Sequence, residues 1–138
     1  GRVPAASNWS RTAGSTTRPT LVSVEVTNTG DRDGTEVVQL YVRDDVASTA
    51  RPIEELIGFG RVDLRVGVTR TVMFTVDPSR LAFHRPDMKL VTEPGTFTFW
   101  VGGSSADTRS AARVDLPGEV AEFDRRGLVP TRVSVSSR

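Results

Sequence analysis

Two pairs of adjacent carboxylates, Asp44/Asp45 and Glu54/Glu55, are the densest acidic groups in the sequence. Paired carboxyl groups can cleave glycosidic bonds when they are held about 5–10 Å apart on either side of the bond. Adjacent side chains in an extended chain point to opposite faces, so neither pair forms such a dyad. We therefore interpret both pairs as solvated charges of a loop.

The single histidine, His84, is the only side chain that could act as an imidazole base. Ser104 and Ser105 follow two glycines, but this run lacks the Gly-x-Ser-x-Gly pattern of a nucleophile elbow. A serine–histidine–aspartate triad is therefore not expected. His84 is predicted to cover a loop or to contact a neighbouring domain.

Metal and redox chemistry find little support in the sequence. The absence of cysteine excludes a disulfide framework, a thiolate nucleophile and a cysteine-based metal site. Asp31, Asp33 and Gly34 resemble the start of a calcium loop, but the glycine stands at position four instead of six, and position twelve is Val42. We predict no metal site, no cofactor and no catalytic residue.

Three aromatic side chains, Trp9, Tyr41 and Trp100, could stack on sugar rings. Trp100 lies on the strand face opposite Phe97 and Phe99, which predicts either partial exposure or packing against another domain. Because aromatic residues make up only 7% of the chain, few side chains are available to form a flat aromatic platform for a carbohydrate.

The composition is that of one ordinary domain. The 138 residues carry 18 basic and 17 acidic side chains, a net charge of +1, which argues against a nucleic-acid surface. No run approaches the roughly 18 apolar residues of a membrane helix. Residues 1–20 lack the apolar centre of a secretory signal, so neither a cytoplasmic nor a secreted location is favoured. All basic residues except Lys89 are arginine, a bias that we interpret as the mark of a GC-rich bacterial genome.

Short runs of alternating apolar and polar residues, separated by turn residues, indicate about seven strands and almost no helix. The runs cover residues 21–27, 35–43, 61–66, 68–76, 89–92, 96–101 and 109–116. They predict an all-β, two-sheet sandwich. Its core is predicted to contain Val24, Val38, Leu40, Val42, Val62, Leu64, Val72, Phe74, Phe97 and Phe99. Asp77 and Pro78 predict one helical turn as its cap and first residue.

Three segments show no clear period. Residues 1–20 are predicted to be a linker or the remnant of a preceding region, and residues 118–138 an arm that could add an edge strand. The domain itself is predicted to span residues 21–117. The excursion at residues 44–60 is predicted to be a loop whose apolar side chains dock on a partner.

The order of motifs over about ninety residues resembles the fibronectin type III-like C-terminal domain of family 3 glycoside hydrolases, the β-glucosidases and β-xylosidases. The matching residues are Asn28-Thr29-Gly30, Gly34, Glu36-Val37-Val38-Gln39-Leu40-Tyr41-Val42, Asp44, Arg51-Pro52, Glu55-Leu56, Gly58-Phe59, Val62-Asp63-Leu64, Leu81-Ala82-Phe83, Glu93-Pro94-Gly95, Val101-Gly102, Ser104-Ser105 and Arg109. The chain departs from the family pattern at Glu54, at residues 66–68 and at residues 84–86.

The resemblance implies an immunoglobulin/fibronectin type III-like sandwich without catalytic residues. In such enzymes the nucleophilic aspartate lies on a barrel domain and the acid/base glutamate on an α/β sandwich domain. The chain is therefore expected to be an accessory domain that stabilises and docks on those two domains, and it could add a contact between subunits. The expected contact residues are Arg51, Glu55, Phe59 and Arg61, with His84 and Trp100 as further candidates.

Two other classes of function remain open. A stand-alone carbohydrate-binding or adhesion module would bind sugar through exposed aromatic side chains. A complete small enzyme has the least support, because no acid/base set converges in the sequence.

Overall fold

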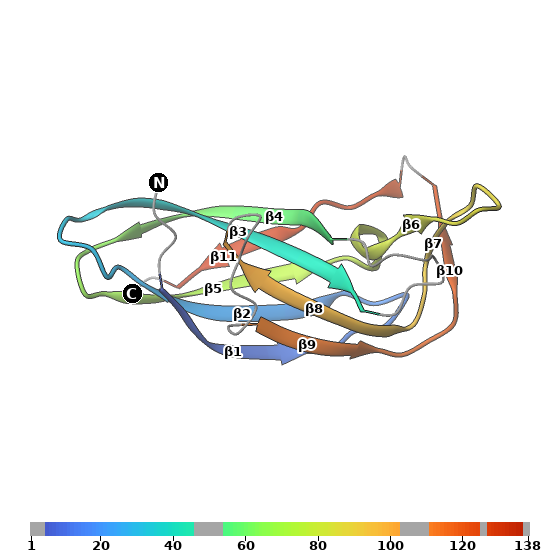
Figure 1. The fold of residues 1–138 in the computed structure, drawn as a ribbon, viewed down its shortest axis with the longest axis horizontal. Helices are drawn as coiled ribbons and strands as arrows, with labels where there is room; N and C mark the ends of the chain where they lie inside the picture. The colour runs from blue at the N-terminus through green and yellow to red at the C-terminus, as the bar shows by residue number, and fades with distance from the viewer. Residues whose placement is uncertain (1–4, 46–53, 103–110, 125–126, 137–138) are drawn as a thin grey trace.

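The computed structural model describes residues 5–45, 54–102, 111–124 and 127–136. Two four-stranded antiparallel sheets pack against each other (Figure 1). Sheet I contains, in order, β1 (Ala5–Thr12), β2 (Thr20–Thr27), β5 (Thr69–Val76) and β11 (Arg132–Val135). Sheet II contains β4 (Glu54–Leu64), β3 (Gly34–Asp44), β8 (Gly95–Val101) and β9 (Ala111–Leu116). The predicted all-β sandwich is confirmed.

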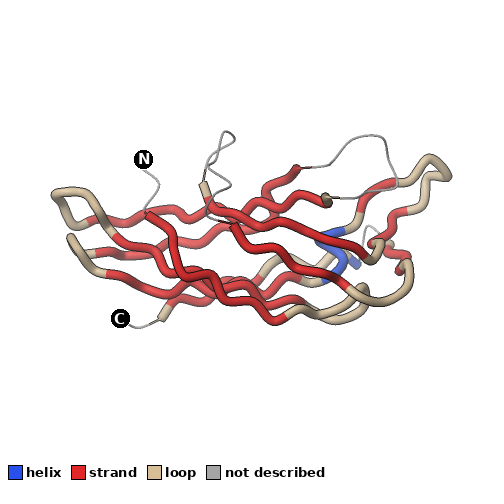
Figure 2. Tube along the Cα trace, turned by 60° about the horizontal axis from the view of Figure 1, so that its bottom comes forward, coloured by secondary structure: helices blue, strands red, loops and turns tan. Residues whose placement is uncertain are grey.

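A third, three-stranded sheet lies with the 3-10 helix η1 (Pro78–Leu81) at one end of the sandwich, on the right in Figure 1. Its strands are β10 (Ala121–Phe123), β7 (Leu90–Thr92) and β6 (Phe83–His84). Figure 2 shows that strands make up most of the described chain. In that part of the chain, no helix is long and apolar enough to cross a membrane.

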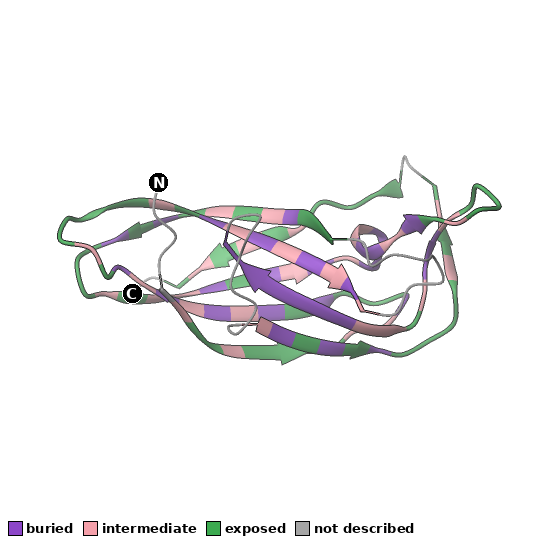
Figure 3. Ribbon diagram, viewed as in Figure 1, coloured by how far each residue is buried: buried purple, intermediate pink, exposed green. Residues whose placement is uncertain are grey.

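The core lies between the two large sheets, where the alternating side chains of both point inward. Val22, Val24 and Val26 of β2 are fully buried, as are Phe74 of β5 and Phe99 of β8. The same alternation appears along β2 and β3 in Figure 3, where buried residues recur at every second position over most of each strand. All ten predicted core residues are buried.

Part of the segment expected to be a linker forms β1, which pairs with β2 along residues 5–12. The register of this pairing shifts between Ser7 and Ser10. As a result Ala6 and Trp9, which are three residues apart, both pack on the core. A bulge of this kind breaks the two-residue period, which explains why the sequence shows no strand here.

The excursion predicted as a loop also contains a strand, because β4 begins at Glu54. Leu40 and Tyr41 of β3 face Gly58 and Leu56, so Ile57 is an extra residue in β4. The bulge reverses the alternation, and Gly58 and Gly60 then occupy inward positions without a side chain. Residues 46–53 lie outside the described part of the chain.

The C-terminal arm supplies the last strand of sheet I. β11 pairs with β5 and lies beside β4, where it helps to close one side of the sandwich. Its Val133 takes the space above Gly60: a Cβ added to that glycine would lie 2.5 Å from Val133 Cγ1. The glycines that hide the β4 pattern in the sequence are therefore the residues that let β11 approach.

The predicted helical turn is confirmed in η1. Asp77 caps it by accepting a hydrogen bond from the Ser79 backbone N–H at 3.0 Å, and Pro78 stands at its start. The Ser79 hydroxyl in turn accepts a hydrogen bond from the Val129 backbone N–H at 3.0 Å. This bond anchors the arm just before it enters β11.

Asn28 joins two turns at the opposite end of the sandwich. Its buried side chain donates to the carbonyls of Arg32 (2.8 Å) and Leu64 (3.1 Å) and accepts from the Gly30 N–H (2.9 Å). The turn after β2 is thereby fixed to the end of β4.

Candidate contact surface

One row of side chains crosses the outer face of sheet II, with two aromatic rings at its centre. The strand registers place Leu56, Tyr41, Trp100 and Ala111 opposite one another. The rings of Tyr41 and Trp100 stack with their centroids 5.8 Å apart and their planes 12° apart. Cross-strand pairs of this type rigidify a sheet, so the row gives this face a firm base.

Trp100 is not available for a ligand, because only 3% of it is exposed. Its indole N–H is buried and has no hydrogen-bond partner. The expected partial exposure of Trp100 is therefore wrong. The other expectation was packing against another domain, but the chain itself already covers this side chain. An aromatic platform that relies on Trp100 therefore has no support in the structure.

The exposed apolar residues of this face gather on β4 and the neighbouring strand β3. Phe59 is 66% exposed, Val37 47% and Leu56 41%. Arg61, opposite Val37 in the register, is exposed as well. We call Val37, Leu56, Phe59 and Arg61 the β4 patch. Its mixture of aromatic, aliphatic and arginine side chains is typical of protein contact surfaces.

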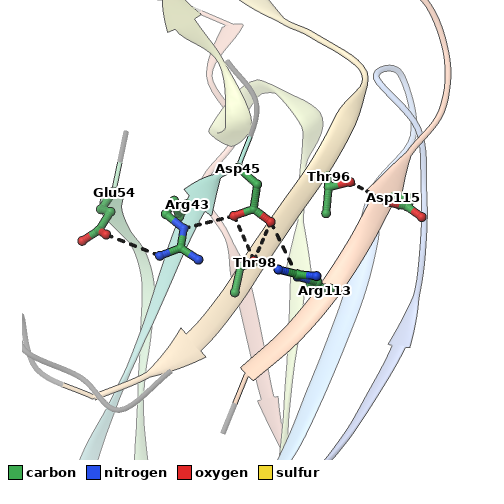
Figure 4. A network of polar contacts seen from close by, with 7 residues as sticks. All are labelled: Arg43, Asp45, Glu54, Thr96, Thr98, Arg113 and Asp115. Atoms are coloured by element: carbon green, nitrogen blue, oxygen red, sulfur yellow. Dashed lines mark hydrogen bonds and ion pairs between the residues drawn. The ribbon is translucent and has the colours of Figure 1, made fainter. Parts of the chain in front are cut away.

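A row of charged and polar side chains crosses the same sheet next to the aromatic row (Figure 4). Asp45 lies at its centre and accepts hydrogen bonds from Arg43 Nε at 3.0 Å and from the Thr98 hydroxyl at 2.8 Å. Arg113 approaches Asp45 at 3.8 Å, and Glu54 approaches Arg43 at 3.9 Å. The charges of this row are matched within the row, which gives it a structural role.

A second feature borders the β4 patch where β4, η1 and the arm meet. A cavity of about 450 Å³ is lined by Leu56, Ile57, Gly58, Phe59, Arg80, Pro130 and Thr131. The Nε of Arg80 and the hydroxyl of Thr131 are both buried and have no hydrogen-bond partner. Glu55 lies on the other side of Arg80, in a smaller hollow that it shares with Asp44. Partial burial raises the pKa of Glu55, and the Arg80 charge opposes this increase.

The structure brings some of the predicted contact residues together and separates others. Phe59 and Arg61 share the β4 patch, and Trp100 lies on the same sheet face but is buried. Glu55 is exposed near the start of β4 and lines a hollow together with Arg80. His84 is exposed on β6, in the third sheet. Arg51 lies outside the described residues. Their assignment as contact residues stays a prediction.

Sequence reasoning missed Val37 and Arg80. The alternation along residues 35–43 places Val37 on the outer face of its strand, but the sequence does not show that β4 lies beside it. Arg80 is brought to the cavity by η1 and the arm, which are fifty residues apart at the Ser79–Val129 bond. No local pattern could show this.

The arrangement offers no catalytic pair among the described residues. Asp44 is buried and Asp45 is held in the charged row, so this pair diverges as the strand geometry requires. Glu54 and Glu55 likewise lie on opposite sides of β4, against Arg43 and Val42 of β3. Within the described ranges, no group of three metal-ligating side chains gathers.

Comparison with known proteins identifies the domain type. The sequence profile of the "Fibronectin type III-like domain" matches residues 36–105, which is more than half of the chain. The chain belongs to the fibronectin type III-like domain family. The resemblance that the motifs indicated is confirmed.

The Fn3-like chain is similar in sequence to part of several much longer proteins. It is 55% identical over 86 residues to a β-xylosidase of Formosa agariphila and 42% identical over 90 residues to a periplasmic β-glucosidase of Salmonella typhimurium. These matches cover 62% and 65% of the chain but only 12% of either relative. The Fn3-like chain thus spans about an eighth of their length.

Solved structures agree with this picture. The Fn3-like chain superposes on the GH3 β-glucosidase of Bifidobacterium adolescentis with a TM-score of 0.69 and 34% identity, covering 81% of this chain and 17% of that one. It superposes on the β-glucosidase of Listeria innocua with a TM-score of 0.69 and 32% identity, covering 85% and 16%. The domain is a small part of such enzymes.

Proposed function

We propose that this Fn3-like chain is a non-catalytic accessory domain of a family 3 β-glucosidase- or β-xylosidase-like enzyme, in which it docks on the catalytic barrel and α/β sandwich domains and stabilises them. The observation that carries the proposal is the match to about an eighth of relatives with those names. The absence of a converging carboxylate pair in the described chain supports it, because glycosidic bond cleavage needs two such groups.

The β4 patch is the surface through which we propose that docking occurs. Phe59 is the most exposed aromatic side chain on that face, and Leu56 and Val37 extend its apolar area. Large exposed apolar side chains grouped together are characteristic of surfaces that a partner covers. Aromatic and arginine side chains contribute strongly to such contacts, so Phe59 and Arg61 are the expected main contributors.

Hydroxyl-radical footprinting of the isolated chain and of the full-length enzyme would test the docking. Phe59 should react readily in the isolated chain and at least about five-fold more slowly in the enzyme, because docking covers it. Met73, which is 40% exposed on β5, provides a matched control on the other large sheet and should react equally in both. Equal reactivity of Phe59 in both proteins would show that the β4 patch is not the contact.

Two simpler assays separate this proposal from the other classes of function. The isolated chain should release no nitrophenol from aryl β-glucosides or β-xylosides above a buffer blank. It should also remain in solution when mixed with insoluble polysaccharides. Retention on a polysaccharide, lost on replacing Phe59 by alanine, would favour a carbohydrate-binding module instead.

A further inference from the structure

Arg80 is the residue whose environment is least explained by the chain itself. Its side chain reaches the cavity between β4, η1 and the arm, where its Nε is buried without an acceptor. Among the described residues, Glu55 is close enough for the Arg80 charge to affect its ionisation, and Glu55 and Asp44 line a smaller hollow together with Arg80. A buried guanidinium N–H without an acceptor is unfavourable, so a native structure normally supplies one.

Thr131 provides a second, independent observation on the same cavity. Thr131 lines the cavity, and its hydroxyl is buried and also has no hydrogen-bond partner. Among the described residues, the lining therefore offers a cation and a hydroxyl but no carboxylate. Its remaining walls are apolar, with Phe59 and Leu56 at the border with the β4 patch.

The cavity is built into the fold and does not depend on a mobile side chain. Val129 is tied to Ser79, and β11 pairs with β5 directly after Thr131, so the arm forms a fixed wall. On the opposite wall, a Cβ added to Gly58 would lie 3.0 Å from Thr131 Cγ2, so the glycine keeps the two walls close. A preformed site loses little conformational freedom when a ligand enters.

We propose that this cavity receives an acidic side chain from the catalytic part of the enzyme, with its carboxylate bound by Arg80 and Thr131 and its apolar neighbour packed on Phe59. The inference rests on the proposed function, which supplies the partner. Charge complementarity selects a carboxylate, because the described lining holds the guanidinium of Arg80, whose Nε has no hydrogen-bond acceptor. A neutral sugar would need acceptor side chains to match its hydroxyls, and the described part of the lining provides no carboxylate or amide for them.

The binding preference can be measured on the chain alone, with hexanoate as the probe and hexanamide as its neutral counterpart. The Arg80 Nε–H signal in a ¹⁵N NMR spectrum should shift saturably with hexanoate, with a dissociation constant on the order of 1–10 mM, a weak affinity expected for so small a ligand. Hexanamide should bind at least about ten-fold more weakly. Equal binding of the two probes, or no shift of the Arg80 signal with either, would overturn the proposal.

Variants assign the effect to the two polar groups. Arg80→Gln should abolish hexanoate binding and Thr131→Val should weaken it about three- to ten-fold, whereas Arg65→Gln, which changes an exposed arginine after β4, should leave it unchanged. The NMR spectra of the same samples report whether each variant is folded. Hexanoate binding that survives in folded Arg80→Gln would overturn the assignment of Arg80.

The experiments distinguish a failure of the docking proposal from a failure of the carboxylate-site proposal. If Phe59 is protected in the full-length enzyme but Arg80→Gln and Arg65→Gln lower its thermal midpoint equally, the docking surface stands and the carboxylate anchor is wrong. If the chain binds hexanoate through Arg80 but Phe59 stays reactive in the enzyme, the cavity is a carboxylate site and the docking proposal is wrong. A larger loss of thermal midpoint for Arg80→Gln than for Arg65→Gln is the expected result.

Discussion

Replacing Gly60 by alanine should destabilise the domain, because its inward position on β4 is filled by the side chain of Val133. The added Cβ would lie 2.5 Å from Val133 Cγ1, whereas carbon atoms pack best at about 3.5–4.0 Å. Val133 is β-branched and its strand is paired with β5, so relief requires a shift of β11. Overpacking of this kind costs about 1–3 kcal/mol.

Urea denaturation followed by tryptophan fluorescence would measure the effect. Gly34→Ala is the matched control, because a Cβ at Gly34 meets no atom within 4 Å, and its free energy of unfolding should stay within about 0.5 kcal/mol of the wild type. Val133→Ala alone should cost about 1 kcal/mol for a partly buried side chain. The double variant should be more stable than the sum of the single effects by about 1–2 kcal/mol. A Gly60→Ala variant as stable as Gly34→Ala would refute the close approach of β11 to β4.

Three further substitutions test other parts of the structure. Asn28→Ala should lower the free energy of unfolding by about 2–3 kcal/mol in the same assay, because it leaves the carbonyl of Leu64 without its buried donor; a loss below about 0.5 kcal/mol would contradict this. Phe74→Ala should cost about 3–5 kcal/mol, since the ring is fully buried between the sheets, and a cost under about 1 kcal/mol would reject the core. Glu55→Gln should be more stabilising at pH 7 than at pH 4. Burial raises the pKa of Glu55 above its ordinary value of 4.5, so the folded state binds the proton more tightly, and stability falls as the pH rises from about 4.5 through the folded pKa. The difference should be a few tenths of a kcal/mol because the carboxyl stays partly solvated, and denaturation curves at both pH values that show no difference would argue against burial as the cause.

The sequence predicted those strands whose alternation is uninterrupted. Val22, Val24 and Val26 repeat every second residue, and β2 has nearly the predicted bounds. β1 and the first part of β4, residues 54–60, were missed because each contains an irregularity that changes which side chains face inward, at Ser7–Ser10 and at Ile57. Register shifts depend on the partner strand, and a single chain read residue by residue does not contain that information.

Some residues of the candidate site could likewise be predicted from the sequence, whereas others depend on the tertiary structure. Phe59 and Arg61 were expected from the aperiodic excursion of the sequence and lie together on the β4 patch. Arg80 gave no sequence signal, because its importance comes from η1, the bulge of β4 and the arm meeting at one point. Residues that acquire a role only through such a meeting require the tertiary structure to be recognised.

The position of β11 on the edge of β5 also bears on self-association. Residues 71–76 of β5 read Thr-Val-Met-Phe-Thr-Val, a six-residue segment without charge, proline or glycine, which is the composition that forms cross-β stacks. β2 covers one edge of this segment and β11 the other. A chain shortened before Arg132 would expose a row of unpaired backbone donors and acceptors beside Phe74, and two such chains could join edge to edge. The arm that forms a wall of the cavity therefore also covers the edge of an aggregation-prone strand and keeps it from pairing with other chains.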